Sequence, residues 1–308
     1  MWGTAFARLL ADRGHDVTLA CHDTEHARAI AETGRNPRTL TDVDLAGIDA
    51  VAGGPEAFAE AELAVLAVPS RAFAQVAATI PADLAVLSLT KGLDPASGER
   101  LSTLLPGRRV AVLSGPNFAG EIAFGLPAAA VVASEDAAYA LELQEEINSL
   151  AFRVYVNDDL TGVELCAAAK NVIALAAGGV DGLGLGDNAK GALIARGLTE
   201  MARLGEACGA RAETFSGLAG MGDLVVTCWS RQGRNRSAGE LIARGATPEE
   251  AAAELGTVEG LTTAPVLRDL SHRLEIELPI TEGVCAVLGG EDLHALAASL
   301  MGRTPTRE

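Results

Sequence analysis

The stretch MWGTAFARLLADRGHDVTLACHD, residues 1–23, decides how the chain is expected to fold. Gly3 leads into a helical run of Ala, Leu and Arg residues, Gly14 ends that run, and residues 17–20 read as a strand. A helix that follows a glycine and leads into a strand is the second half of a βαβ nucleotide-binding unit. The first strand of that unit, and the first two glycines of its G-x-G-x-x-G loop, are therefore expected upstream of Met1.

Beyond this stretch, short apolar runs alternate with helical segments as far as residue 157. The strand-like runs are residues 63–70, 84–93, 110–119, 128–134 and 152–156, whereas residues 36–60 are expected to form a loop or a small hairpin. Several runs end in Pro, Gly or Ser turns, at the edge where open α/β sheets bind ligands. Only 4% of the residues are aromatic and 49% are hydrophobic, which suits helices packed on a parallel sheet. We expect a dinucleotide-binding domain over residues 1–157.

The pattern changes to helices alone from about residue 158. Thr161 and Glu164 have the spacing of a capping box, and a strongly apolar helix follows them. Further helices are expected over residues 187–208, 237–245, 248–255, 262–273 and 281–288, with a last helix and a tail over 289–308. With 308 residues, two domains are expected. The second is an all-helical domain over residues 158–308, with the active site in the cleft between the two.

Composition excludes several classes of protein. A net charge of −17 argues against a general nucleic-acid binder. No run reaches 18 apolar residues and the first residues lack a signal-peptide layout, so neither a membrane span nor secretion is expected. The five cysteines are widely spaced and form no metal-binding pattern, which indicates reduced thiols and no metal site. A cytoplasmic location is expected.

Lysine is rare in this chain. There are 21 arginines and three lysines, Lys91, Lys170 and Lys190. Lys170 lies in the apolar helix, where it is the only charged residue between residues 165 and 180. It could be a snorkelling side chain at a helix edge. A desolvated lysine, however, has a lowered pKa and can transfer a proton near neutral pH, as an acid or base acting on a carbonyl or alcohol requires.

A second group of candidate residues indicates an anionic ligand. Arg231, Arg234 and Arg236 lie close together, and guanidinium groups bind phosphate with two hydrogen bonds, although a solvated basic loop would have the same sequence. Asp223, in a Met-Gly-Asp turn, is either a helix cap or a partner for Lys170. Lys91 and the Gly115–Asn117 turn each follow a strand, where turn formation alone is the alternative.

Nine motifs in a fixed order give the chain a family resemblance. They are WGTAFA (2–7), AVPS (67–70), LTKGL (89–93), SGPNFAGE (114–121), AAAKNVIALAAG (167–178), DGLGLGDNAKGALIARG (181–197), GMGDLVVTC (220–228), GRNR (233–236) and TVEG (257–260). Together they resemble the bacterial-type NAD(P)-dependent glycerol-3-phosphate dehydrogenases. The resemblance implies a Rossmann-type domain, lacking its N-terminal strand here, and an all-α domain of the 6-phosphogluconate-dehydrogenase-like kind.

The resemblance also implies an activity and a set of site residues. The reaction is reversible reduction of dihydroxyacetone phosphate to sn-glycerol 3-phosphate with NAD or NADP, for glycerophospholipid biosynthesis. Lys170 matches the general acid/base, and Lys190 is left structural. Substrate contacts fall on Lys91, Gly115, Asn117, Asp223, Gly233, Arg234 and Asn235. Cofactor contacts fall on Trp2, Gly3, His22, Lys91, Ala119, Arg234, Thr257 and Glu259, with Gly3 as the third glycine of the loop.

Two departures from the family pattern keep alternatives open. Gly233 stands where the family usually has Ser, and Cys21-His22-Asp23 offers no clear acid for the ribose, so preference between NAD and NADP is undecided. A non-catalytic or impaired truncated member remains an alternative. A related hydroxyacid or ketopantoate reductase is another, although GRNR and SGPNFA suit a phosphate-bearing substrate. A homodimer through the helical domain is also expected.

Overall fold

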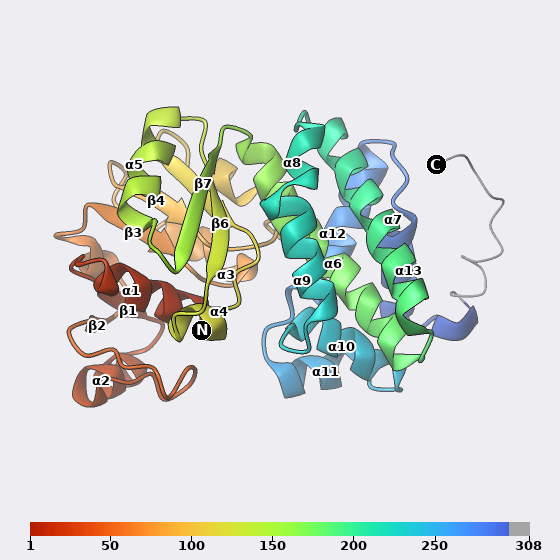
Figure 1. Cartoon of the computed structure of the whole chain (residues 1–308), viewed down its shortest axis with the longest axis horizontal. Coiled ribbons are helices and arrows are strands. Elements are labelled where there is room, and N and C mark those ends of the chain that lie inside the picture. The colour runs from red at the N-terminus through yellow and green to blue at the C-terminus, as the bar shows by residue number, and fades with distance from the viewer. Residues whose placement is uncertain (296–308) are drawn as a thin grey trace.

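The computed structural model describes residues 1–295, in two units that lie side by side (Figure 1). The N-terminal unit alternates strands and helices, and the described part of the C-terminal unit contains only helices. The fold is therefore an N-terminal Rossmann-like α/β domain followed by an all-helical domain. The expected boundary between residues 157 and 158 lies between the last strand and the longest helix, and it stays a prediction. The helix and tail expected over residues 289–308 fall largely outside the described residues.

The α/β unit contains the strands that the apolar runs predict. They are β1 (Thr18–Cys21), β2 (Asp49–Ala52), β3 (Leu63–Leu66), β4 (Ala85–Ser88), β5 (Val110–Ser114), β6 (Ala128–Ala133) and β7 (Phe152–Asn157). The helices are α1 (Trp2–Asp12), α2 (Thr24–Thr33), α3 (Ser70–Ala77), α4 (Ala119–Ala123) and α5 (Ala137–Ile147). Two 3₁₀ turns, η1 (Pro55–Phe58) and η2 (Leu101–Leu104), complete the unit.

These strands form two separate ladders. One is the parallel pair β1-β2, and the other has the order β3-β4-β5-β6-β7, with every neighbour parallel except β5 and β6. Of the loop or small hairpin expected over residues 36–60, the hairpin is wrong, because this stretch is largely a loop with one strand, β2, that pairs in parallel with β1. The expected parallel sheet is also wrong for the larger ladder, which is mixed. Strand β2 is only four residues long and mostly exposed, so it has no clear apolar pattern from which a strand could be predicted. The strand expected before Met1 stays a prediction.

Helices cover both faces of the larger sheet. Val86 and Leu87 are consecutive in β4 and therefore point to opposite faces. Leu87 packs in one buried cluster with Phe6 of α1 and with α5, whereas Val86 packs in another with Phe73 of α3. Both faces of the sheet are consequently shielded from solvent, as expected for strands composed mainly of apolar residues.

The helical unit is built around one long helix, α6 (Leu160–Gly182). The others are α7 (Gly186–Ala207), α8 (Ala212–Ser216), a π-helical turn η3 (Leu218–Gly222), α9 (Asp223–Trp229), α10 (Arg234–Ala243), α11 (Pro248–Leu255), α12 (Glu259–Arg273) and α13 (Pro279–Leu288). By length and composition α6 could cross a membrane, but 89% of its most apolar window is buried inside the protein, so it is a core helix. Gly178 and Gly239 let α6 and α10 approach closely, since a Cβ at either would collide with a backbone carbonyl of the other helix.

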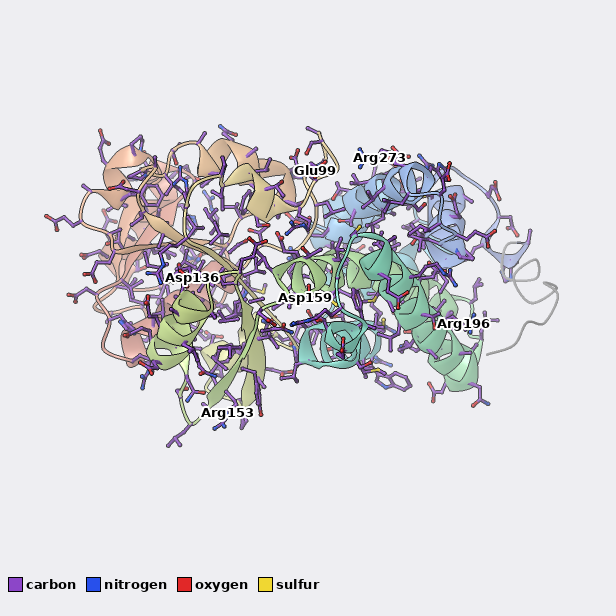
Figure 2. The ribbon with its side chains drawn as sticks, turned by 90° about the horizontal axis from the view of Figure 1, so that it is seen from above. Glu99, Asp136, Arg153, Asp159, Arg196 and Arg273 are labelled. Atoms are coloured by element: carbon purple, nitrogen blue, oxygen red, sulfur yellow. The ribbon has the colours of Figure 1, made fainter. Side chains whose placement is uncertain are left out.

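The start of α6 differs from the expected capping box. Asp159 caps the helix by accepting a hydrogen bond from the backbone N–H of Gly162 at 2.9 Å. Glu164 instead accepts from the backbone N–H of Ser102 at 2.9 Å and from Arg100 at 2.8 Å, and so fastens the two units together. The expectation failed because an aspartate just before the helix takes the cap. Figure 2 shows Asp159 at the junction of the units, and Glu99 and Arg273 from opposite units near the same junction.

Candidate active site

Two parallel strands place the first site residues at one edge of the sheet. β4 and β5 are parallel neighbours, so the residues that follow them, Lys91 and the Gly115–Asn117 turn, lie at the same edge. Gly115 has φ +136°, and a Cβ there would lie 3.0 Å from the carbonyl oxygen of Ala129. The turn therefore requires glycine, and its conformation directs the Gly115 carbonyl towards Lys91, whose Nζ donates to it at 3.2 Å.

The helical unit supplies a buried ion pair opposite this edge. Lys170, in the middle of α6, is only 5% exposed, and Asp223, the first residue of α9, is 2% exposed. The Nζ of Lys170 donates to Oδ1 of Asp223 at 2.7 Å and to the hydroxyl of Thr227 at 2.8 Å. Asp223 is thus the partner of Lys170, and the snorkelling alternative for this lysine is wrong.

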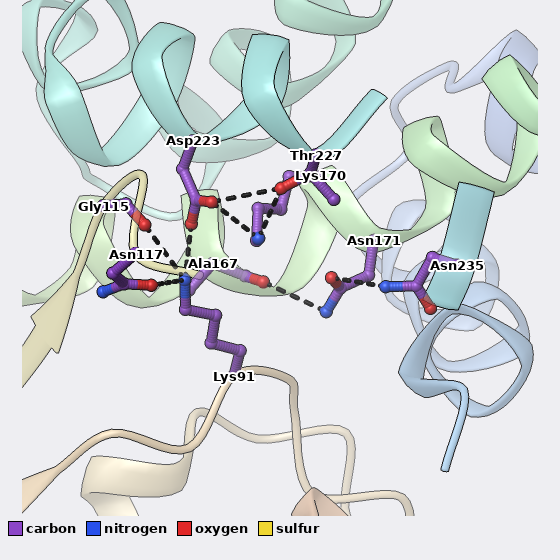
Figure 3. Close-up of polar contacts among 9 residues, drawn as sticks. All are labelled: Lys91, Gly115, Asn117, Ala167, Lys170, Asn171, Asp223, Thr227 and Asn235. Carbon is purple, nitrogen blue, oxygen red and sulfur yellow. Dashed lines mark hydrogen bonds and ion pairs between the residues drawn. The ribbon is translucent and has the colours of Figure 1, made fainter. Parts of the chain in front are cut away.

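Asp223 also joins the two units. The Nζ of Lys91 donates to Oδ2 of Asp223 at 2.7 Å and to Oδ1 of Asn117 at 2.9 Å (Figure 3). One buried carboxylate therefore holds two ammonium groups, one from the sheet edge and one from α6. The three groups together carry one net positive charge, in a protein whose overall charge is −17.

The charges in this cluster shift each other's protonation. Burial is the largest influence on Lys91 and lowers its pKa to about 8; Asp223 opposes this shift and Lys170 adds to it. Burial alone would raise the pKa of Asp223, but Lys170 and Lys91 together outweigh it and hold that pKa below its ordinary value. Asp223 is consequently a stable anion, and Lys91 can gain or lose a proton close to neutral pH.

A helix N-terminus lies beside this cluster. Gly233 precedes α10, and Arg234 and Asn235 are its first residues. Asn235 donates to the side chain of Asn171 at 2.8 Å and accepts from the backbone N–H of Gly260 at 2.8 Å, which fixes α10 against α6 and α12 (Figure 3). Arg234 is exposed and lies near the start of α1. Burial lowers the pKa of the Met1 amino group, and the positive charge of the Arg234 guanidinium lowers it further.

Not every basic residue of the 231–236 stretch faces a ligand. Arg236 is buried and pairs with Asp181 at 2.6 Å and Glu240 at 2.7 Å. Lys190, which is 4% exposed, pairs with the same Asp181 at 2.7 Å. The expected cluster of three phosphate-binding arginines is therefore wrong for Arg236, which helps to hold α10 against α6 and α7.

Apart from Lys91, the residues expected to contact a dinucleotide lie outside the lysine network within residues 1–295. Trp2 and Gly3 begin α1, His22 is exposed after β1, Ala119 begins α4, Thr257 precedes α12 and Glu259 begins it. A Cβ on Gly3 would lie 3.1 Å from the Cβ of Ala67 after β3, consistent with its expected packing role. The carboxylate of Glu259 accepts from the hydroxyl of Ser70 at 2.7 Å, at the start of α3.

Two buried donors without partners fit bound ligands. The indole N–H of Trp2 and the amide Nδ2 of Asn117 are buried without a hydrogen-bond partner among the described residues. Buried donors normally have partners, so each indicates a ligand atom or a water. Trp2 lies at the start of the nucleotide-binding helix, as a cofactor contact would require, and Asn117 lies beside Lys91, among the residues expected to contact the substrate.

Known proteins share this arrangement along the whole chain. The family model for the N-terminus of NAD-dependent glycerol-3-phosphate dehydrogenase matches residues 1–140, and that for its C-terminus matches residues 159–297. The glycerol-3-phosphate dehydrogenase (NAD(P)+) of Moorella thermoacetica is 44% identical over 317 residues, covering 100% of this chain and 95% of that protein. The chain belongs to the NAD(P)-dependent glycerol-3-phosphate dehydrogenase family. It is accordingly an oxidoreductase that uses NAD or NADP.

Further members of the family agree. The glycerol-3-phosphate dehydrogenase of Halorhodospira halophila is 44% identical over 319 residues, covering 100% of this chain and 96% of that protein. The crystal structure of glycerol-3-phosphate dehydrogenase from Coxiella burnetii superimposes with a TM-score of 0.94 at 37% identity, covering 98% of this chain and 96% of that one. Family membership favours this dehydrogenase over the related reductases that the sequence left open.

Two residues of the site were missed from the sequence. Thr227 is the second partner of Lys170, and its signal was available, because it lies one helical turn after Asp223. Ser70 holds Glu259 across the junction of the two units. It belongs to the AVPS motif, but no spacing rule connects it to a glutamate 189 residues later.

Proposed function

We propose that this chain reduces dihydroxyacetone phosphate reversibly to sn-glycerol 3-phosphate, and so supplies glycerophospholipid biosynthesis. One observation carries the proposal: the Asp223 carboxylate holds the ammonium groups of Lys91 and Lys170 at 2.7 Å each, where the sheet edge meets α6. Lys170 donates to Asp223 and Thr227 and keeps a third N–H for a carbonyl oxygen, and the net positive charge of the cluster suits a substrate with a phosphate.

Lys170 is the proposed general acid. As an ammonium ion it donates a proton to the C2 oxygen of the substrate, and it accepts that proton in the reverse direction. Asp223 and Thr227 hold the nitrogen in place while its charge changes. A nicotinamide cofactor, when bound, would supply the hydride for C2.

Lys91 and its neighbours position the substrate in this proposal. The Lys91 ammonium donates its three N–H groups to the Gly115 carbonyl, Asn117 and Asp223, which fixes its positive charge beside the proposed substrate site. Because Lys91 is largely buried, its charge stabilises negative charge that develops on the substrate oxygen more than it would in water. The unpartnered Nδ2 of Asn117 is a further donor for the substrate.

The start of α10 is the proposed phosphate site. Gly233 precedes a ten-residue helix, and Arg234 and Asn235 bring their backbone N–H groups, a guanidinium and an amide to its positive end. Two lysines and Arg234 minus Asp223 give a net charge of +2, which balances a phosphate monoester dianion. A Ser at position 233 would place its Cβ 3.0 Å from the carbonyl oxygen of Thr227, so the glycine lets the chain turn closely here.

The roles are tested by comparing two equally buried lysines. For Lys170→Ala, kcat for the oxidation of NADPH by dihydroxyacetone phosphate should fall by about 10²–10⁴-fold, while KM changes much less. Lys170→Arg should not restore turnover, because arginine stays protonated. Lys190→Met is the control: it removes a buried lysine paired with an aspartate outside the site and should keep kcat. Near-full turnover in Lys170→Arg would contradict the acid/base role.

Location and assembly complete the proposal. We propose that the enzyme acts in the cytoplasm as a homodimer formed through its helical unit. Three half-exposed apolar residues at helical spacing, Met221, Val225 and Trp229, support an interface on that unit. Light scattering on the purified chain should give twice the monomer mass of 31.5 kDa. A mass of 31.5 kDa at micromolar concentration would contradict the dimer.

A further inference from the structure

The carboxyl end of β1 is where a dinucleotide places its adenosine ribose. In this fold an acidic residue about 20 positions after the glycine loop binds the ribose 2′-hydroxyl of NAD, whereas a nearby arginine accommodates the 2′-phosphate of NADP. Asp23 occupies the acidic position, two residues after the end of β1 and 20 residues after Gly3. Its surroundings decide which of the two cofactors the site favours.

Both oxygens of Asp23 already have donors. Oδ1 accepts from the backbone N–H of His26 at 2.7 Å, which caps α2, and Oδ2 pairs with Nη1 of Arg38 at 2.7 Å. The carboxylate is therefore committed to the start of α2 and neutralised by a guanidinium. What this edge offers a ligand is an exposed arginine rather than a free acid.

A buried asparagine fixes the position of Arg38. Asn36, 3% exposed, accepts from the backbone N–H of Arg38 at 3.0 Å and donates to the hydroxyl of Thr4 in α1 at 2.9 Å. Its Oδ1 also lies 2.9 Å from Nε2 of His26 in α2. The loop is thus tied to both helices of the nucleotide-binding unit, and Arg38 is held beside the end of β1.

The next residue provides an independent observation. The hydroxyl of Thr39 is buried and has no hydrogen-bond partner within the described part of the chain. The residue after it, Leu40, has φ +55°, a left-handed conformation that is rare for leucine and that the surrounding loop must impose. An unsatisfied buried hydroxyl next to an exposed guanidinium indicates a missing acceptor, such as a phosphate oxygen.

We propose that Arg38 and Thr39 bind the adenosine 2′-phosphate, so that this chain prefers NADP to NAD. The planar guanidinium forms paired hydrogen bonds to phosphate, and the Thr39 hydroxyl supplies a further donor. Asp23 remains at the start of α2 and does not compete for the ribose. This inference rests on the proposed function, since it specifies the cofactor of that reaction.

The test compares two probes that differ only in the 2′-phosphate, titrated calorimetrically into the intact chain. Adenosine 2′,5′-bisphosphate should bind about tenfold or more tightly than adenosine 5′-monophosphate. A tenfold difference corresponds to about 1.4 kcal/mol, which one hydrogen bond to a charged group can supply. Arg38→Ala should abolish the difference, and Thr39→Val should reduce it. Arg35→Ala, which removes an exposed arginine of the same loop, should keep it.

Equal affinities for the two probes, or an unchanged preference in Arg38→Ala, would overturn the inference. Arg38→Lys keeps the charge but loses the planar fork, and it should retain only part of the preference. Turnover of dihydroxyacetone phosphate with saturating NADH or NADPH tests the proposed function separately. Turnover with both cofactors but no probe preference would remove only the cofactor assignment, whereas no turnover with either would remove the proposed function.

Discussion

Replacing Asp223 by asparagine removes the charge that holds the site together. Three hydrogen bonds end on this carboxylate, from Lys91 and Lys170 at 2.7 Å each and from Thr227 at 3.1 Å. In Asp223→Asn the amide oxygen can accept from one lysine, but the amide N–H₂ then faces the other ammonium group. Removing one partner of a buried ion pair costs about 3–5 kcal/mol, so unfolding free energy at pH 7 should fall by that amount.

The loss should depend on pH in a defined direction. Without Asp223, burial and mutual repulsion lower the folded-state pKa of Lys91 still further below its unfolded value. The unfolded chain then binds more protons than the folded one, so stability rises with pH towards 10.5. At pH 10 the difference from the parent should shrink towards the roughly 1 kcal/mol of ordinary hydrogen bonds. Urea unfolding at pH 7, 8.5 and 10 measures this.

Asp181→Asn is the matched control. Asp181 also joins two cations, Lys190 at 2.7 Å and Arg236 at 2.6 Å, but outside the site. Both variants should lose stability, whereas kcat/KM should fall by about a hundredfold or more only in Asp223→Asn. This reasoning would be refuted if Asp223→Asn lost less than about 1 kcal/mol of stability, or lost an amount independent of pH, and had the same kcat/KM as Asp181→Asn.

Three further predictions concern the supporting structure. Gly115→Ala should lower stability by about 2–3 kcal/mol and raise KM, because φ +136° and the Ala129 carbonyl leave no room for a Cβ. Thermal unfolding and kinetics measure the two effects, and an unchanged KM would contradict a substrate contact at this turn. Burial raises the pKa of Glu200 to about 7 from an ordinary 4.5, so stability present below pH 4.5 is lost as pH rises to 7. Glu200→Gln should therefore show a flatter profile of Tm against pH, with a higher Tm than the parent at pH 8; parallel profiles would contradict the shift. Ser70→Ala removes the hydroxyl that donates to Glu259 and leaves only the weaker backbone N–H contact at 3.4 Å, so the Kd for NADPH should change several-fold with kcat within about twofold. A fall in kcat alone would contradict a cofactor-side role.

Much of the fold could be predicted because the relevant signals are local. Strands β3 to β7 are apolar runs ending in turns, and α7 ends before Gly209, which has φ +79°. What failed depended on partners distant in sequence. The four residues of β2 become a strand only because β1 pairs with them, and the direction of β6 is set by its contacts with β5 and β7.

The site shows the same division. Lys170 could be predicted as functional because a lone charge in an apolar helix needs a reason to be buried. Its link to Lys91 through Asp223 is visible only when the sheet edge and α6 meet, since these residues come from three separate segments. Arg236 looked like a phosphate ligand because its sequence neighbours are basic, and only the packing of α10 on α6 reveals its pairing with Asp181.

The central claim is that this chain reduces a carbonyl substrate that carries a phosphate. The most direct test measures NADPH oxidation by the purified 308-residue chain with dihydroxyacetone phosphate and, in parallel, with dihydroxyacetone. We predict oxidation with dihydroxyacetone phosphate at a kcat/KM at least about a hundredfold above that for dihydroxyacetone, since two or more charge-assisted hydrogen bonds to phosphate are lost without it. No oxidation by a folded sample, or equal rates with the two substrates, would contradict the account.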